Sequence, residues 1–255
     1  MSALLLSFVA LAEPMAADTA CAGGQVVASL PEVGATGVPV DVVPVAVLST
    51  GDCESSAWTA RLIVADTSEE VASAAASEGA ILLELHPTAL LAPFTDYIVQ
   101  ASAEDGIGAV TEIGFATGDG SAAVLDGVPE IVEGGATWYE ESRELALSAD
   151  VQPAASADGA SLLAIGDDGE VDVAGAEIVT GSGAHAVLGR TSTYRPADEV
   201  CLVARQRDHA GRWAESEPLC AEPEIVEAAC GCDAGVGALG VMPILLAAML
   251  ARRRG

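Results

Sequence analysis

The chain has 255 residues, of which 38 are acidic and 10 basic, so its formal net charge is −28. All ten basic residues are arginine, because the sequence contains neither lysine nor asparagine. This charge argues against binding to DNA, RNA or anionic lipid headgroups, since polyanions need a basic footprint on the protein. A hydrophobic content of 51% also argues against a disordered chain.

The N-terminal end is typical of a secretory signal peptide. Ala3–Ala12 form an uncharged apolar run that is short for a span of a bilayer. Ala10 and Ala12 form the small-x-small pattern that signal peptidase recognises, and cleavage further along, as far as Ala20, fits as well. Residues 1–20 are therefore predicted to be a signal peptide, cleaved somewhere between residues 12 and 20.

The C-terminal end has the features of a membrane anchor. Residues 234–251 carry no charge, and at about 1.5 Å per residue a helix of this length reaches ~27 Å, close to the thickness of a bilayer core. Arg252, Arg253 and Arg254 follow, and the positive-inside tendency places them on the cytoplasmic side. The sequence predicts a transmembrane helix at 234–251 with a cytoplasmic tail.

Cys230, Gly231 and Cys232 precede this apolar segment and its terminal arginines. In its order and position, the segment Cys230–Gly255 resembles the MYXO-CTERM type of sorting signal. The resemblance implies recognition by a dedicated membrane protease near Cys230, loss of the helix, and display at the cell surface through a lipid on cysteine. A plain single-pass anchor is the alternative.

The sequence contains six cysteines, and an exported chain can oxidise its thiols. With the two cysteines of the tail motif set aside, proximity suggests the disulfides Cys21–Cys53 and Cys201–Cys220. Each would stabilise its domain by about 3 kcal/mol in the chain-entropy picture. Zinc binding is the competing hypothesis, but paired C-x2-C spacings are missing and no histidine is near enough in sequence.

Between the two ends, short alternating segments are separated by Gly, Pro, Asp and Ser. Trp58–Val64, Asp96–Ala101 and Thr111–Phe115 alternate from one residue to the next, as strands with one buried face do. Such segments, with turn residues every eight to twelve positions, favour an antiparallel sandwich. Thr67–Ala75 is the one segment compatible with a helical turn.

One pattern recurs along the chain. Leu91–Gly108 aligns with Tyr194–Gly211 at a constant offset of 103 residues, about the length of one Ig-like or fibronectin-III-like domain. Tyr97 is placed to bond back to the backbone, as in a tyrosine corner. Val200 takes its place in the second copy, so that corner needs another support, such as the second predicted disulfide.

Pro31–Pro39, Leu91–Tyr97 and Phe115–Gly118 match, in order, an opening segment, a corner and a closing strand. Together they make Ser29–Gly118 resemble the bacterial Ig-like domain of the SbsA type, which implies an Ig-like sandwich. The chain departs from that family at Glu104–Gly108, where the hairpin is altered. The second domain is only generically Ig-like or fibronectin-III-like.

The sequence thus predicts an all-β protein of two tandem Ig-like or fibronectin-III-like antiparallel sandwiches, with an N-terminal signal segment and a C-terminal transmembrane helix. The predicted boundaries are 1–20 for the signal peptide, 21–119 for the SbsA-type domain, 126–223 for the second domain, 224–233 for an acidic stalk with the sorting motif, 234–251 for the helix and 252–255 for the tail.

Catalytic motifs are not found in the sequence. Gly181-Ser182-Gly183, with His185 two residues later, comes nearest to a nucleophile motif, but a glycine-rich hairpin explains it better. No His-Glu-x-x-His, P-loop or dinucleotide motif is present. We therefore expect neither enzymatic activity nor a cofactor.

A calcium site is a secondary hypothesis. Asp167, Asp168, Glu170 and Asp172 place four carboxylates around Gly169, and calcium prefers oxygen ligands. The spacing is not that of an EF-hand, and an Asp-Gly turn between two strands is the simpler explanation.

Four aromatic residues raise the hypothesis of a glycan site. Trp58 follows the apolar face of its strand and is expected in the core. Trp138 and Tyr139 are adjacent and should point to opposite faces of a strand, which leaves one of them exposed. The fourth is Trp213.

These observations predict a non-enzymatic structural or adhesive protein that is exported to the cell envelope and anchored at the outer surface. Its expected partners are the membrane, reached through the helix or a processed anchor, a sorting protease, and a cell-surface protein or glycan, with no nucleic acid. The alternative is a calcium- or glycan-binding module that retains a partner at the surface.

Overall fold

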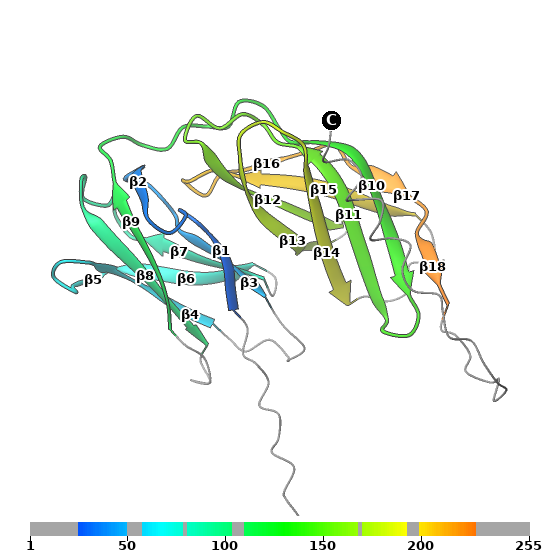
Figure 1. Ribbon diagram of the computed structural model, residues 1–255, viewed down its shortest axis with the longest axis horizontal. Coiled ribbons are helices and arrows are strands. Elements are labelled where there is room, and N and C mark those ends of the chain that lie inside the picture. Colours follow the sequence, from blue (N-terminus) through cyan, green and yellow to red (C-terminus); the bar gives the residue numbers. More distant parts are fainter. Residues whose placement is uncertain are drawn as a thin grey trace, which may run out of the picture.

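The computed structural model describes residues 25–49, 58–78, 81–103, 110–167, 170–192 and 199–227. Among these residues it contains eighteen strands and no helix. The strands form two sandwiches, which Figure 1 shows side by side, with the first in blue to green and the second in green to orange. The chain is an all-β protein of two Ig-like sandwiches, as predicted.

The first sandwich pairs sheet β1-β3-β7-β6 with sheet β2-β9-β8-β4-β5. When its strands are lettered in chain order, these sheets are A-B-E-D and A′-G-F-C-C′, an arrangement of the immunoglobulin type. Its strands are β1 (Gln25–Leu30), β2 (Ala35–Val38), β3 (Val45–Ser49), β4 (Trp58–Val64), β5 (Glu70–Val71), β6 (Ser73–Glu78), β7 (Leu82–Pro87), β8 (Asp96–Ala103) and β9 (Thr111–Thr117).

The second sandwich pairs sheet β14-β11-β10-β18 with sheet β13-β12-β15-β16. In the latter sheet β16 pairs with the end of β15, and β17 pairs with its beginning. In chain order, β10 to β16 take the letters A, B, C, C′, E, F and G. Strands E, B and A of one sheet thus face strands C′, C, F and G of the other, which is the same plan without strand D. Its strands are β10 (Glu130–Tyr139), β11 (Glu144–Gln152), β12 (Ala160–Asp167), β13 (Glu170–Thr180), β14 (His185–Ser192), β15 (Val200–Arg207), β16 (Trp213–Glu215), β17 (Leu219–Ala221) and β18 (Glu224–Val226).

Each sandwich encloses a hydrophobic core between its two sheets. In β11 the side chains of Leu145, Leu147, Ala149 and Val151 are buried, whereas the residues that alternate with them are more exposed. This alternation follows from the strand period of two, which turns every second side chain toward the core. The first core is built in the same way, and the rings of Tyr97 and Phe115 lie there 5.8 Å apart.

The predicted tyrosine corner is present in the first sandwich. Tyr97 is buried in β8, and its hydroxyl accepts a hydrogen bond of 2.9 Å from the backbone N–H of Ala92. Thr117 closes the same corner, because its hydroxyl lies 2.7 Å from the carbonyl oxygen of Ala92. The connection between β7 and β8 is therefore held by side chains, as in immunoglobulin domains.

The open side of the second sandwich is closed by a crossing of β13 and β14, which belong to different sheets. Gly175 and Gly189 lie at the crossing. A Cβ atom on Gly189 would lie 2.7 Å from the carbonyl carbon of Ala174, and one on Gly175 would overlap the carbonyl oxygen of Leu188. Glycine is required here because the two backbones approach more closely than any side chain allows.

Two local predictions were wrong. Thr67–Ala75 does not form a helical turn, because β5 pairs with β4 and β6 pairs with β7, so sheet pairing overrides the local preference of an alanine-rich segment. The predicted stalk 224–233 begins with a strand, since β18 pairs in parallel with the end of β10. The branched side chains of Ile225 and Val226 suit this position at an open sheet edge.

Candidate functional site

The outer faces of two sheets pack against each other between the sandwiches. Sheet β1-β3-β7-β6 of the first contacts sheet β13-β12-β15-β16 of the second, so the protein is a stack of four sheets. The fully buried hydrophobic residues of this contact are Leu30, Val45, Val47 and Leu82 on one side and Leu162, Ala164 and Val173 on the other. We call this contact the interdomain interface.

A buried ion pair lies in the interdomain interface. Arg207, on β15, is completely inaccessible to solvent, and its Nε lies 3.0 Å from Oε1 of Glu84 on β7. Its Nη1 also donates to the carbonyl oxygen of Val43, at 3.1 Å. The other carboxylate oxygen of Glu84 lies 2.9 Å from Nε2 of His86. Glu84 and Val43 belong to the first sandwich, so the guanidinium joins the two domains.

Arg205 and Trp213 extend this cluster along the second sandwich. The guanidinium of Arg205 lies 4.7 Å from the ring centroid of Trp213, a cation–π distance. Its Nε donates to Glu215 at 2.9 Å. The indole of Trp213 packs against the apolar part of the interdomain interface. This tryptophan is therefore part of an internal contact between domains.

The loop between β15 and β16 lies against the linker that connects the two sandwiches. The carboxylate of Asp208 binds Arg212 through Nε at 2.6 Å and through the backbone N–H at 2.9 Å. Nη2 of Arg212 donates to the carbonyl oxygens of Ala122 and Ala123. The same loop also contacts the first sandwich: the carbonyl oxygen of His209, the residue after Asp208, accepts a hydrogen bond of 2.7 Å from the N–H of Val43.

Two aspartates hold the linker from opposite sides. Oδ1 of Asp41, in the first sandwich, accepts from the N–H of Ala122 at 2.6 Å. Oδ2 of Asp158, in the second, accepts from the N–H of Ala123 at 2.9 Å. The linker is thus tied to both domains.

Burial lowers the pKa of His209 below its ordinary value of 6.5, because desolvation disfavours the imidazolium. Asp158, whose Oδ2 lies 3.9 Å from Nδ1, opposes this effect, as do Asp208 and Asp41, whereas Arg207 adds to it. His209 is therefore neutral at pH 7, where it lies buried in the loop that meets the linker.

A groove of about 560 Å³ opens between the sandwiches at the edge of the interdomain interface. We call it the interdomain groove. Among the described residues that line it, none carries a carboxylate. Its principal side chains are Val27 and Ile81 from the first sandwich and Tyr139, Ala174, Leu188 and Arg190 from the second.

A second, shallow hollow of about 380 Å³ lies on the outer face of the first sandwich, over β4, β8 and β9. Nε of Arg61 donates to Gln100 at 2.8 Å, and Nε2 of Gln100 donates to Glu112 at 2.8 Å. These side chains form a ladder across three strands. Arg61 and Glu112 carry opposite charges, and Gln100 links them.

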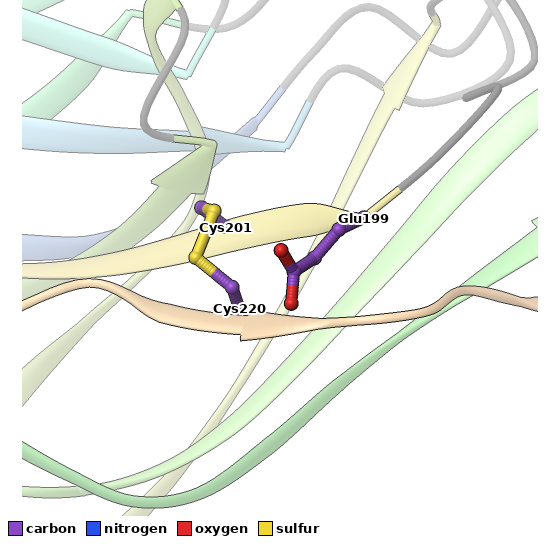
Figure 2. Close-up of side chains that lie close together, drawn as sticks. All are labelled: Glu199, Cys201 and Cys220. Atoms are coloured by element: carbon purple, nitrogen blue, oxygen red, sulfur yellow. A yellow bond between two sulfur atoms is a disulfide. The ribbon is translucent and has the colours of Figure 1, made fainter.

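The predicted disulfide Cys201–Cys220 is present, and it joins directly opposed residues of β15 and β17. Figure 2 shows the carboxylate of Glu199 beside it. These three residues are the one group of possible metal ligands close together within the described part of the chain. Because both sulfurs are consumed in the disulfide, only the carboxylate is left as a ligand, and we assign no metal site here.

The predicted calcium residues lie at the connection between β12 and β13. Asp167 is exposed at the end of β12 and pairs with Glu170, which leaves Asp168 and Gly169 as a two-residue connection. Asp168 and the side chains of Glu170 and Asp172 lie outside what the structure describes. The hairpin is present, and calcium binding stays a prediction.

The aromatic candidates for a glycan site do not form a shared platform. Trp138 is buried in the core of the second sandwich, whereas Tyr139 is partly exposed, as their opposite orientations predict. Trp58 is partly buried against the first core. Tyr139 alone lines the interdomain groove among these three residues.

Gly181-Ser182-Gly183 connects β13 with β14, which lie in different sheets, so this segment is a crossover between sheets and not a hairpin within one. The carbonyl oxygen of Ser182 accepts from the side-chain amide of Gln152. His185 begins β14 and pairs with Val151 in the sheet. In the described structure this segment serves as the connection between β13 and β14.

Several predicted residues lie outside the described parts of the chain: Cys21, Cys53, Cys230, Gly231, Cys232, Arg252, Arg253 and Arg254, together with the apolar segment 234–251. Within the described residues, no helix is long and apolar enough to span a membrane. The second disulfide, the sorting motif and the anchor stay predictions.

The interdomain interface was not predicted, although the sequence holds a signal for it. Val45–Leu48 and Leu162–Ile165 are uninterrupted apolar runs, and in the structure all of their residues are buried. A strand of an isolated sandwich should alternate between apolar and polar residues, because only one of its faces is buried. A continuous apolar run therefore indicates a strand that is buried on both faces. The charged partners Arg207 and Glu84 carry no comparable sequence signal.

No protein-family profile and no curated protein matches the chain. Solved structures that match in part are fibronectin(III)-like modules of Clostridium thermocellum CbhA, with 11% identity over 81% of this chain and 97% of that one, at a TM-score of 0.24. Another is the N-terminal Ig1-2 module of the Drosophila receptor protein tyrosine phosphatase DLAR, with 10% identity over 80% and 99% of the two chains, at a TM-score of 0.26. The fold assignment rests on the strand order of each sandwich.

Proposed function

We propose that the chain is a non-enzymatic structural or adhesive protein of the cell envelope, in which two Ig-like sandwiches form one rigid unit. The observation that carries the proposal is the Arg207–Glu84 ion pair, buried between the domains. Tandem domains that move independently meet through small polar contacts. Here the contact is apolar and encloses a charge pair, and the linker is tied to both sides, so the geometry suits a spacer of fixed shape.

The buried polar side chains support a structural role. The amide of Gln206 bonds both backbone groups of Ala154 and the hydroxyl of Ser161, so it secures a loop of the second sandwich. Asp208 is engaged with Arg212, and Arg207 with the first sandwich. Each of these groups is used to hold one segment against another, which is what a scaffold requires.

Export and anchoring rest on the sequence. The signal segment 1–20 and the segment Cys230–Gly255, with its resemblance to a MYXO-CTERM signal, support display at the outer surface. The resemblance of Ser29–Gly118 to SbsA-type domains supports a place in the cell envelope. The formal charge of −28 favours a soluble, extended position away from anionic membrane surfaces.

Protease treatment of intact cells tests the display. If the proposal is correct, added protease should remove the protein from the cell surface, and Cys230→Ala should leave it in the inner membrane, inaccessible to the protease. Val132→Ala is the control, because it changes an exposed residue outside the sorting motif. Wild-type protein that stays fully protected in intact cells, yet is cleaved after lysis, contradicts surface display.

A further inference from the structure

One large apolar side chain is held out from the first sandwich. Phe94 is 77% exposed, and its φ of 52° places it in the left-handed region, where a bulky residue is an outlier. Its N–H lies 3.4 Å from the carbonyl oxygen of Gly118, which ties it to the end of β9. Leu90, at the same corner, is 69% exposed. Strain of this kind persists where the surrounding structure enforces it, and it marks candidate functional positions.

The interdomain groove, whose lining mixes polar and apolar surface, is a recess of suitable size for such a side chain. Its volume of about 560 Å³ falls within the roughly 300–1,000 Å³ of ordinary ligand pockets. Leu188, which is 74% exposed, and Val27, which is 61% exposed, lie on its two sides. Exposed aliphatic side chains from two domains that line one recess indicate an interaction site.

Phe94 and the interdomain groove lie at opposite ends of the first sandwich. Val27 and Ser49, which line the groove, lie where β1 begins and β3 ends. Phe94 is bonded to Gly118, which follows the opposite end, where β9 finishes beside β2. Figure 1 shows the start of β1 and the arrowhead of β9 at these two ends. A single copy therefore cannot fill its own groove with Phe94.

The charges around the two features are complementary. The described groove lining carries no carboxylate, although the chain is strongly acidic, and its one charged side chain is the exposed Arg190. The carboxylate of Glu144 lies 3.7 Å from it, a weak exposed pair. Phe94 is accompanied by the exposed Asp96 and Asp119, the latter next to Gly118. The acidic corner of one copy suits the arginine of another.

We propose that copies of this chain associate head to tail, with Phe94 of one copy inserted into the interdomain groove of the next. Because the two surfaces differ and lie at opposite ends, the contact is heterologous, and it can continue from copy to copy. The groove needs both sandwiches in their docked arrangement, so association depends on the interdomain interface. The inference extends the structural role proposed above from a single spacer to an assembly.

Site-specific photo-crosslinking in the cells that make the full-length chain tests this directly. Phe94 is replaced by p-benzoylphenylalanine in one tagged copy, and a second copy with a different tag is expressed beside it. Irradiation should join the two copies, and mass spectrometry should locate the crosslink in the peptides that contain Leu188 or Val27. The same photoreactive residue at Val132, which is 64% exposed on β10, is the control and should give no such adduct.

Three further substitutions distinguish loss of the contact from general effects on folding. Leu188→Asp, carried by the second copy, should lower the adduct yield at least about tenfold, which corresponds to the loss of one apolar contact. Arg190→Asp should also weaken it, and Asp96→Arg in the first copy should restore part of the yield. Rescue by a reversed charge pair cannot arise from a merely misfolded variant.

The proposal is overturned if residue 94 gives no crosslink to a second copy, if it joins another protein instead, or if the crosslink maps outside the groove. It is also overturned if Leu188→Asp leaves the yield unchanged. Because these experiments measure association between copies, and protease treatment measures display, failure of one proposal is distinguishable from failure of the other.

Discussion

Arg207 shows how a single charge sets the relation between two domains. Its guanidinium is fully buried, and its ion-pair partner Glu84 is nearly so. Removing two charges from water is costly, and the attraction between them offsets that cost only while both are present. The pair therefore penalises any shift of the sandwiches that leaves one of the two charges buried without the other.

Arg207→Met should destabilise the protein by about 3–5 kcal/mol, because it leaves the carboxylate of Glu84 buried without its cation. The double variant Arg207→Met, Glu84→Leu should recover most of that loss. Urea unfolding followed by tryptophan fluorescence measures both. Arg190→Met, which removes an exposed arginine with a carboxylate at 3.7 Å, is the control and should cost less than about 1 kcal/mol. Equal effects at the two positions would contradict this account of the interface.

His209 makes the stability of the protein depend on pH. Since burial lowers its pKa in the folded state below 6.5, the unfolded chain binds more protons between the lowered pKa and 6.5, and stability rises with pH across that window. Stability should therefore fall as the pH is lowered from 7.5 through 6.5 and below.

His209→Gln should remove this part of the pH dependence while leaving the contribution of the carboxylates. The measurement is the free energy of unfolding of both proteins from pH 7.5 to 5, and the difference between the two curves isolates the histidine. Parallel curves would show that His209 has no depressed pKa in the folded protein.

At the scale of single elements, the crossing of β13 and β14 closes the second sandwich without a hydrogen-bonded ladder. Gly189→Ala should destabilise the protein by about 1–3 kcal/mol or more, because the new Cβ meets backbone that cannot move aside. Gly135→Ala, on β10, is the matched control, since no atom lies within 4 Å of its Cβ, and it should be neutral or stabilising by roughly 0.5–1 kcal/mol. Thermal unfolding of the two variants checks the contrast.

The corner that precedes β8 contains a hydrogen bond to the hydroxyl of Tyr97. Tyr97→Phe keeps the ring in the core and removes only the acceptor for the N–H of Ala92. An unsatisfied N–H should cost about 1–3 kcal/mol. Tyr139→Phe, at a partly exposed position, should change stability by less than about 0.5 kcal/mol. Chemical denaturation that finds both variants alike would show that the corner contributes nothing to stability.

At the scale of the whole molecule, the four stacked sheets should unfold as one cooperative unit. Leu162 faces the interdomain interface, whereas its neighbour Leu163 faces the core of the second sandwich. Leu162→Asp should therefore split the single transition into two, and Leu163→Asp should unfold the second sandwich itself. Differential scanning calorimetry distinguishes these outcomes through the ratio of calorimetric to van't Hoff enthalpy. Two independent transitions in the unaltered protein would contradict the rigid unit.

Much of each sandwich was predictable from local patterns. Alternation in β4, β8 and β9 was confirmed, as were the corner at Tyr97 and the Cys201–Cys220 disulfide, because each depends on residues close in sequence or on the strand period. The segment Thr67–Ala75 was predicted wrongly: its two strands pair with their sequence neighbours β4 and β7, in two different sheets, and the composition of the segment does not encode that pairing. Local preference is weak where a sheet edge is available.

The amino-acid sequence by itself determined that the chain is a strongly acidic, all-β protein with two repeats, because strand periodicity and turn residues act over a few positions. Only the tertiary structure decided that the repeats pack face to face, that Arg207 meets Glu84, and that a groove opens between them. Arg207 and Glu84, for example, are more than one hundred positions apart. The energies of these contacts arise from burial that no local pattern encodes, and the proposed association through Phe94 depends on that arrangement.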